Sequence, residues 1–99
     1  MKFVIKYSGG DMFAECDGRK EVYFLKDIIY KNYKDTVFKT HKNFNLRAKM
    51  FSMPLKNNDT LSDLILKENS EILNDIQFPA CYVLYLGMIS DHTSKCLII

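Results

Sequence analysis

The chain has 99 residues, of which 47% are hydrophobic and 26% are charged. This length and composition are typical of one compact domain and leave no core for a second. The 14 basic and 12 acidic residues give a formal net charge of +2, so the overall field neither requires nor excludes a polyanionic partner. Without a signal-peptide core or an apolar stretch of membrane-spanning length, we expect a protein of the nucleus and cytoplasm that makes no membrane contact.

The first residues predict a β-hairpin. Phe3 and Ile5 fall on one side of an alternating pattern, which indicates a strand with one buried face. The Gly9-Gly10 pair supplies the positive φ angles that tight hairpin turns need. Residues 12–17 resume the alternation, so we predict two antiparallel strands joined at these glycines.

The hydrophobic period changes to that of a helix between residues 22 and 33. Four residues fall within one arc of this helix, namely Val22, Leu25, Ile29 and Tyr33. Four further apolar residues lie outside the arc, namely Tyr23, Phe24, Ile28 and Tyr30. We predict one main helix whose core arc crosses the hairpin, and whose surplus apolar surface meets either the following loop or a partner.

The middle of the chain predicts short elements separated by loops. Residues 34–45 are polar and indicate a long connection, anchored by Val37, Phe38 and Phe44. Residues 46–51 alternate and predict a third strand, and turn residues suggest a short fourth strand around Pro54. Thr60 then begins a helical turn in which its hydroxyl accepts a hydrogen bond from the amide of Asp63, while Asp63 reaches back.

Residues 81–86 are strongly β-prone and free of charge, which favours a central strand. If the even-numbered residues face the core, Val83 and Tyr85 face away from it. Together with Val4 on the adjacent first strand, Val83 and Tyr85 form an apolar group that we predict to bind a partner. The alternative is that the C-terminal residues 97–99 cover this face.

The predicted order is hairpin, helix, two strands, capped turn and central strand. This is the order of a β-grasp, an α+β fold with a mixed sheet, its first strand lying centrally beside the last, and one main helix across one face. We assign residues 1–87 to this domain and residues 88–99 to a C-terminal tail.

Three segments carry a resemblance to the ubiquitin-like family. Residues Lys56 to Asp63 are similar to the ubiquitin segment in which an acidic Gly turn precedes Thr-Leu-Ser-Asp. Val22 to Lys26 resembles the Val-Phe-Glu-Leu-Lys that begins the helix of elongin B, and Gln77 to Ala80 resembles the Gln-Ala-Pro-Ala before its last strand. Over residues 1–86, the chain therefore most resembles the elongin B class of ubiquitin-ligase subunits.

The resemblance implies a non-catalytic adaptor that pairs with an elongin C-like protein, in a cullin-RING ubiquitin ligase or an elongin complex. The chain ends at Ile99 without the Gly-Gly that conjugation requires, so we do not expect it to be a conjugated modifier. Lys49 takes the position that matches the isoleucine at the centre of ubiquitin's recognition patch. Because an ammonium there is strongly hydrated, we expect ordinary ubiquitin receptors not to bind.

Two other functions stay open. One is a free-standing ubiquitin-like domain that docks onto a different complex. The other is a nucleic-acid-binding domain, whose contacts would be Lys39, Lys42, Arg47 and Lys49. Aromatic residues are interleaved with these basic residues, and such a site would lose affinity steeply with salt. A solvated loop with hydrophobic anchors is the simpler interpretation of this stretch.

The cysteines and histidines show no pattern of a catalytic or metal site. Cys16, Cys81 and Cys96 are an odd number without close spacing, which fits free thiols in a reducing compartment. His92 and Cys96 could supply two metal ligands, but no second close pair completes a tetrahedral site. Neither Cys16 nor Cys81 has a local signature of a nucleophile with His41 or His92 as base. We therefore expect no enzymatic activity, no metal and no cofactor.

Overall fold

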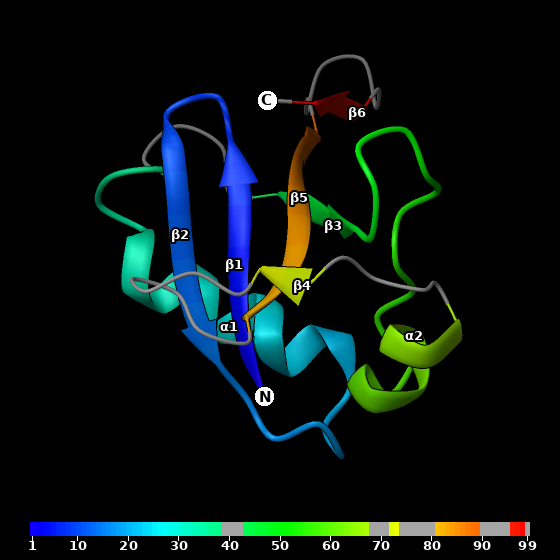
Figure 1. Ribbon diagram of the computed structural model, residues 1–99. Coiled ribbons are helices and arrows are strands. Elements are labelled where there is room, and N and C mark those ends of the chain that lie inside the picture. The colour runs from blue at the N-terminus through cyan, green and yellow to red at the C-terminus, as the bar shows by residue number, and fades with distance from the viewer. Residues whose placement is uncertain (39–42, 68–71, 74–80, 90–95, 99) are drawn as a thin grey trace.

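The computed structural model describes residues 1–38, 43–67, 72–73, 81–89 and 96–98. Its elements are β1 (Lys2–Tyr7), β2 (Gly10–Glu15), α1 (Val22–Tyr33), β3 (Phe44–Arg47), α2 (Leu61–Lys67), β4 (Ile72–Leu73), β5 (Cys81–Ile89) and β6 (Cys96–Ile98). The sheet has the order β2-β1-β5-β3, and the short strands β4 and β6 also pair with β5. In Figure 1, α1 crosses behind this sheet. The predicted α+β fold of the β-grasp type is confirmed.

The hairpin of β1 and β2 closes with a two-residue loop, because Tyr7 pairs with Gly10. Of the two glycines predicted to adopt a positive φ, only Gly10 does so, at 139°. Gly9 leaves room for the Tyr7 ring, since a Cβ at Gly9 would lie 2.5 Å from Cε2 of Tyr7. The far end of the hairpin is extended by Met1, whose amino group donates to the carbonyl of Cys16 at 2.8 Å.

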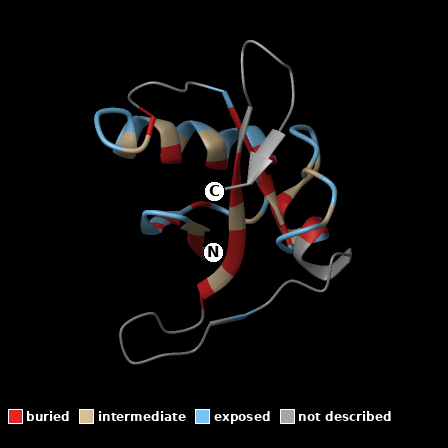
Figure 2. Ribbon diagram, turned by 90° about the horizontal axis from the view of Figure 1, so that it is seen from above, coloured by how far each residue is buried: buried red, intermediate tan, exposed pale blue. Residues whose placement is uncertain are grey.

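β1 and β5 lie side by side at the centre of the sheet, as predicted, and they run parallel. Their register places Phe3 opposite Tyr82 and Ile5 opposite Leu84, so these side chains point to the same face. The helix side chains Val22, Leu25 and Ile29 are fully buried against this face. Figure 2 shows buried segments on both the helix and the central strand, as expected for one shared core.

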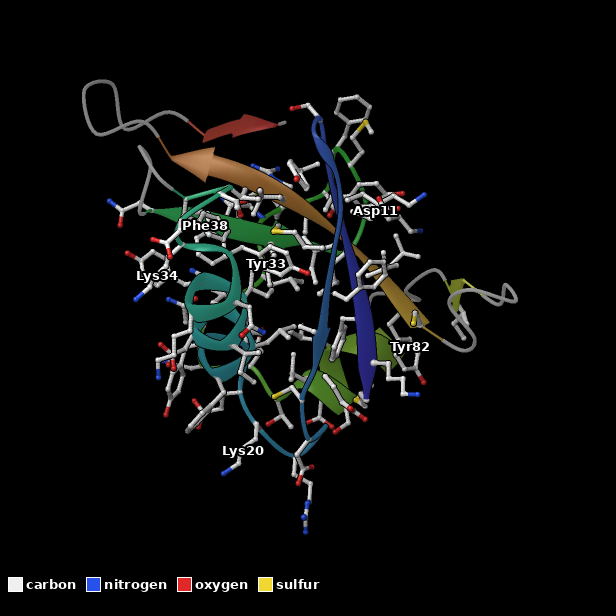
Figure 3. All side chains as sticks on the ribbon, turned by 90° about the vertical axis from the view of Figure 1, so that its left-hand side faces the viewer. Asp11, Lys20, Tyr33, Lys34, Phe38 and Tyr82 are labelled. Atoms are coloured by element: carbon white, nitrogen blue, oxygen red, sulfur yellow. The ribbon has the colours of Figure 1, made fainter. Side chains whose placement is uncertain are left out.

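The segment after α1 is held by aromatic contacts. The rings of Phe38 and Phe44 stack with centroids 4.5 Å apart, and the Tyr30 ring lies 5.8 Å from that of Phe38. Tyr33, labelled with Phe38 in Figure 3, accepts a hydrogen bond at its hydroxyl from the amide of Phe13 at 3.0 Å. The predicted anchors Phe38 and Phe44 are thus confirmed, and part of the surplus apolar surface of α1 meets the following loop.

The predicted third and fourth strands were partly wrong. β3 ends at Arg47, whereas the predicted strand extended to residue 51. Ser52 donates its amide to the carbonyl of Lys49 at 3.1 Å, and this turn ends the strand. No strand forms around Pro54 within residues 53–56. The segment is instead joined to β3 by the amide of Leu55, which donates to the carbonyl of Leu46 at 2.8 Å.

The helical turn predicted near Thr60 exists as α2, but its cap differs from the prediction. The amides of Leu61 and Ser62 donate to the carbonyls of Lys20 and Gly18, each at 2.9 Å. Within the described residues, no hydrogen bond joins the Thr60 hydroxyl to the Asp63 amide. The loop before α1 therefore supplies the acceptors that first-turn amides need, a contact between distant segments that local pattern cannot predict.

The boundary predicted after residue 87 falls inside β5. β6 pairs with the end of this strand, with Gly87 opposite Ile98 and Ile89 opposite Cys96. The described part of the predicted tail is therefore part of the sheet. No helix of the described residues is both long enough and apolar enough to cross a membrane.

Candidate protein-binding surfaces

The structure brings together the three residues predicted to bind a partner. Val4 lies opposite Val83 on the sheet face away from α1, and Val4, Val83 and Cys81 form a second buried cluster on which Tyr85 packs. The predicted register is therefore confirmed. The prediction of an open apolar surface is wrong, because Val4 is 0% and Val83 is 3% exposed within this single chain. The alternating pattern identifies the face, but it cannot reveal that the chain itself covers it.

The alternative cover predicted for this face was residues 97–99. Residues 97 and 98 lie in β6, whose backbone pairs with β5. The described part of the structure includes neither their side chains nor residue 99. Whether they cover Val83 therefore stays a prediction.

The basic residues predicted for nucleic-acid binding are placed only in part. Lys39 and Lys42 fall outside the described residues. Arg47 is half-buried, and its Nη1 donates to the carbonyl of Ser52. Lys49 is exposed, with its backbone engaged in a turn. Arg47 thus has a structural task, and the described residues assemble no basic groove from this set.

The two most exposed large apolar side chains of the described residues lie in the loop after β3. Phe51 is 87% and Met53 is 83% exposed, and Met50 beside them is 46% exposed. We call these three residues the apolar turn. The alternating pattern does not reveal their exposure, because it assigns Met50 and Phe51 to the two faces of a strand. The available signal was the density of large apolar residues next to a proline, Met50 to Pro54, where a loop would ordinarily be polar.

Hydrogen bonds hold the apolar turn in one conformation. The hydroxyl of Ser52 accepts from the Lys49 amide at 3.1 Å and donates to the Lys49 carbonyl at 2.9 Å. The Ser52 amide donates to the same carbonyl, and Arg47 binds the Ser52 carbonyl. Lys49, placed by sequence comparison at the centre of a recognition patch, therefore lies in this turn and not in a strand.

A second surface lies on the outer side of α1. A cleft of about 560 Å³ is lined by Tyr23, Phe24, Lys26, Asp27, Tyr30 and Phe44. Tyr23 is 45% exposed, and its ring centroid lies 4.4 Å from that of Phe24. Lys20 adds a cation above the Phe24 ring, with Nζ 4.9 Å from the centroid. This is the part of the predicted surplus apolar surface that the following loop leaves open.

Lys26 is the basic residue among those that line this cleft. Its Nζ donates to Oδ1 of Asn57 at 3.1 Å and lies 5.4 Å from the centroid of the Phe44 ring. Desolvation by burial lowers the pKa of the Lys26 ammonium. The neighbouring carboxylate of Asp27 instead pairs with Lys31 at 2.9 Å, so Lys26 has no ion pair with a described carboxylate.

The candidate catalytic and metal-binding residues are not brought together in the described part of the chain. Cys16 and Cys81 are buried and form no disulfide within the described residues, and burial raises the pKa of Cys16. His41 and His92 lie outside the described residues, as does the side chain of Cys96. The residues that the structure describes contain no group of three His, Cys, Asp or Glu side chains placed to hold a metal ion.

Comparison with known proteins adds no relative to this picture. No family model matches the sequence, and no curated protein matches it. The β-grasp fold therefore comes from the structure, whereas the elongin B-like resemblance is carried only by the sequence segments quoted for it.

Proposed function

We propose that the protein is a non-catalytic adaptor of β-grasp fold that binds another protein through the apolar turn. The observation that carries the proposal is the exposure of Phe51 and Met53 on a hydrogen-bonded turn. Neither side chain contributes to the buried clusters that the described residues form. Large apolar side chains held in water without a role in the core are typical of interaction sites.

The energetics of this turn favour binding. Burying one large apolar side chain contributes about 1.5–3 kcal/mol, and an aromatic anchor commonly dominates an interface. Methionine adds an adaptable surface around such an anchor. Because the Ser52 hydrogen bonds already order the backbone, less conformational entropy is lost on association.

The resemblance suggests the partner. The proposed partner is an elongin C-like protein. The two would act in a cullin-RING ubiquitin ligase or an elongin complex, in the nucleus and cytoplasm. The support lies in the segments Val22 to Lys26 and Gln77 to Ala80, together with the β-grasp fold. A different host complex is the competing possibility for the same surface.

A binding titration of the purified chain with an elongin C-like protein tests both parts of the proposal. We expect a complex of equal stoichiometry by calorimetry and size-exclusion chromatography. Phe51→Ser should weaken it at least about tenfold, as expected when a central anchor is lost. Ile72→Ser is the matched control, because Ile72 is an exposed apolar residue on another element.

The outcomes separate the two parts. If no complex forms, the elongin C-like partner is wrong. If a complex forms and both Phe51→Ser and Met53→Ser bind as tightly as the unmodified chain, the apolar turn is not the contact surface.

A further inference from the structure

A second hollow lies near the cleft beside α1. That hollow has a volume of about 620 Å³ and is lined by Lys26, Asn45 and the loop residues 54–59. Lys26 lines both hollows, so its side chain borders each of them. We call the combined depression the α1 groove. It runs from the aromatic pair Tyr23 and Phe24 to the loop before α2.

Lys26 makes this groove selective for a negative group. The ammonium is partly withdrawn from water, which disfavours its charged form unless a partner compensates. Among the described residues, the Lys26 ammonium contacts the neutral side-chain amide of Asn57 and the face of the Phe44 ring. A lysine ammonium has three N–H donors, and the Asn57 contact uses one of them. A carboxylate entering the groove would therefore find donors and an unneutralised charge.

The other charges that line the groove are mixed. Asp27 lines the aromatic hollow and pairs with Lys31, whereas Lys56 and Asp59 line the other hollow. The two carboxylates make the groove a poorer match for a chain of phosphates, whose repeated negative charge would lie beside them. A single carboxylate flanked by apolar groups avoids that repulsion, and it can place the apolar groups on the Tyr23 and Phe24 rings.

We propose that the α1 groove binds an extended peptide segment of a partner protein, with one Asp or Glu side chain on Lys26 and an adjacent apolar side chain on Tyr23 and Phe24. This site is separate from the apolar turn, so the proposal goes beyond the adaptor function above. A groove made of two hollows suits an extended segment, which can fill one hollow with each of two nearby side chains.

An array of blocked nonapeptides tests the proposal with the full chain. The central residue is Glu, Gln or Lys, and the flanking positions vary among Leu, Ile, Phe and Tyr. We expect binding to be strongest for Glu-centred peptides, at least about tenfold tighter than for their Gln counterparts by fluorescence anisotropy. Amide shifts in NMR spectra should then map to Tyr23, Lys26 and Phe44, and not to Phe51.

Lys26→Met removes the charge and keeps an apolar side chain of similar length. With this variant, the affinity for Glu-centred peptides should fall to that for Gln-centred ones. Lys34→Met is the control, because Lys34 is exposed and lines neither hollow. Thermal melting verifies that Lys26→Met folds, and Tyr23→Ser is a second probe of the same groove that removes an exposed ring.

Three results would overturn the proposal. The first is an array without preference for Glu over Gln. The second is unchanged peptide affinity in both Lys26→Met and Tyr23→Ser. The third is tighter binding of a single-stranded oligonucleotide than of any peptide, with amide shifts in the same groove, which would assign it to a polyanion. Phe51→Ser should leave peptide binding unchanged, so failure here is distinguishable from failure of the adaptor proposal.

Discussion

Single residues decide how the apolar turn is presented. Ser52 satisfies both backbone groups of Lys49 with one hydroxyl, and Arg47 fixes the next carbonyl. Their hydrogen bonds close the four-residue stretch from Lys49 to Ser52 that displays Met50 and Phe51. The sequence shows the residue types, but it does not show these partners, because the strand pattern of Leu46, Ala48 and Met50 predicts a different backbone.

Ser52→Ala should loosen this turn without unfolding the protein. The substitution removes two hydrogen bonds at an exposed site, each of which contributes about 0.5–1.5 kcal/mol at most. We expect faster amide hydrogen exchange at Lys49 and a several-fold weaker complex with the partner. Ser52→Thr, which keeps the hydroxyl, is the control. If hydrogen exchange in the loop is the same in Ser52→Ala as in the unmodified chain, the hydroxyl does not order the turn.

Asp17 and Arg19 give a residue-scale prediction about pH. The Arg19 guanidinium donates to both carboxylate oxygens of Asp17, and the Arg19 amide donates to Oδ1. These hydrogen bonds lower the pKa of Asp17 from 3.8 to about 2. Because the folded-state pKa is the lower one, any stability that this pair contributes is present above about pH 4 and is lost as the pH falls toward 2.

A carboxyl titration by NMR measures this shift directly. Arg19→Ala should return the pKa of Asp17 toward 3.8, and Lys20→Ala should move it much less, because Lys20 has the smallest effect on this carboxyl. A midpoint near 3.8 in the unmodified chain would mean that the pair does not persist in solution.

At the scale of elements, periodic segments were predictable and connections were not. α1 has the bounds that its helical period predicted, because Val22, Leu25 and Ile29 all face one core. The two faces of the hairpin strands followed from alternation, but the loop lies at Ser8 and Gly9, one residue before the predicted Gly9-Gly10 turn. The third strand was extended too far because its alternation continues into the turn. The cap of α2 was missed because its acceptors come from a loop about forty residues earlier, at Gly18 and Lys20.

Gly10 provides the test of the hairpin. Its φ of 139° is unfavourable for any residue with a Cβ, while a Cβ there would meet no neighbouring atom. Gly10→Ala should therefore lower the free energy of unfolding through backbone strain alone, by about 1–3 kcal/mol. Urea denaturation measures the loss. Ser8→Ala, on the same loop, should change it little, and equal stability of the two variants would show that the turn adopts another conformation.

At the scale of the whole molecule, the sheet buries apolar residues on both faces. One face packs on α1, and the other carries the cluster of Val4, Cys81 and Val83. The sequence predicted the division into two faces correctly, because period-two alternation follows from strand geometry. It left open whether the second face would be buried by the chain or by a partner, because this depends on where distant parts of the chain lie. The candidate binding surfaces of the structure are therefore not on the sheet, where the sequence predicted one, but on the loop after β3 and on the outer side of α1.

Val83 tests whether the second cluster is formed by the chain alone. If it is, Val83→Ala removes buried methyl groups and should lower the free energy of unfolding by about 2 kcal/mol without any partner. Leu84→Ala, on the opposite face in the main core, should cost about 2–5 kcal/mol. The slope of the urea transition should stay unchanged in both, because the folded state remains equally compact.

Val83→Thr separates packing from exposure, since it keeps the volume and places a hydroxyl in the cluster. If Val83→Ala and Val83→Thr unfold at the same urea concentration as the unmodified chain while partner binding is lost, this face is open in solution, and the partner surface lies on the sheet.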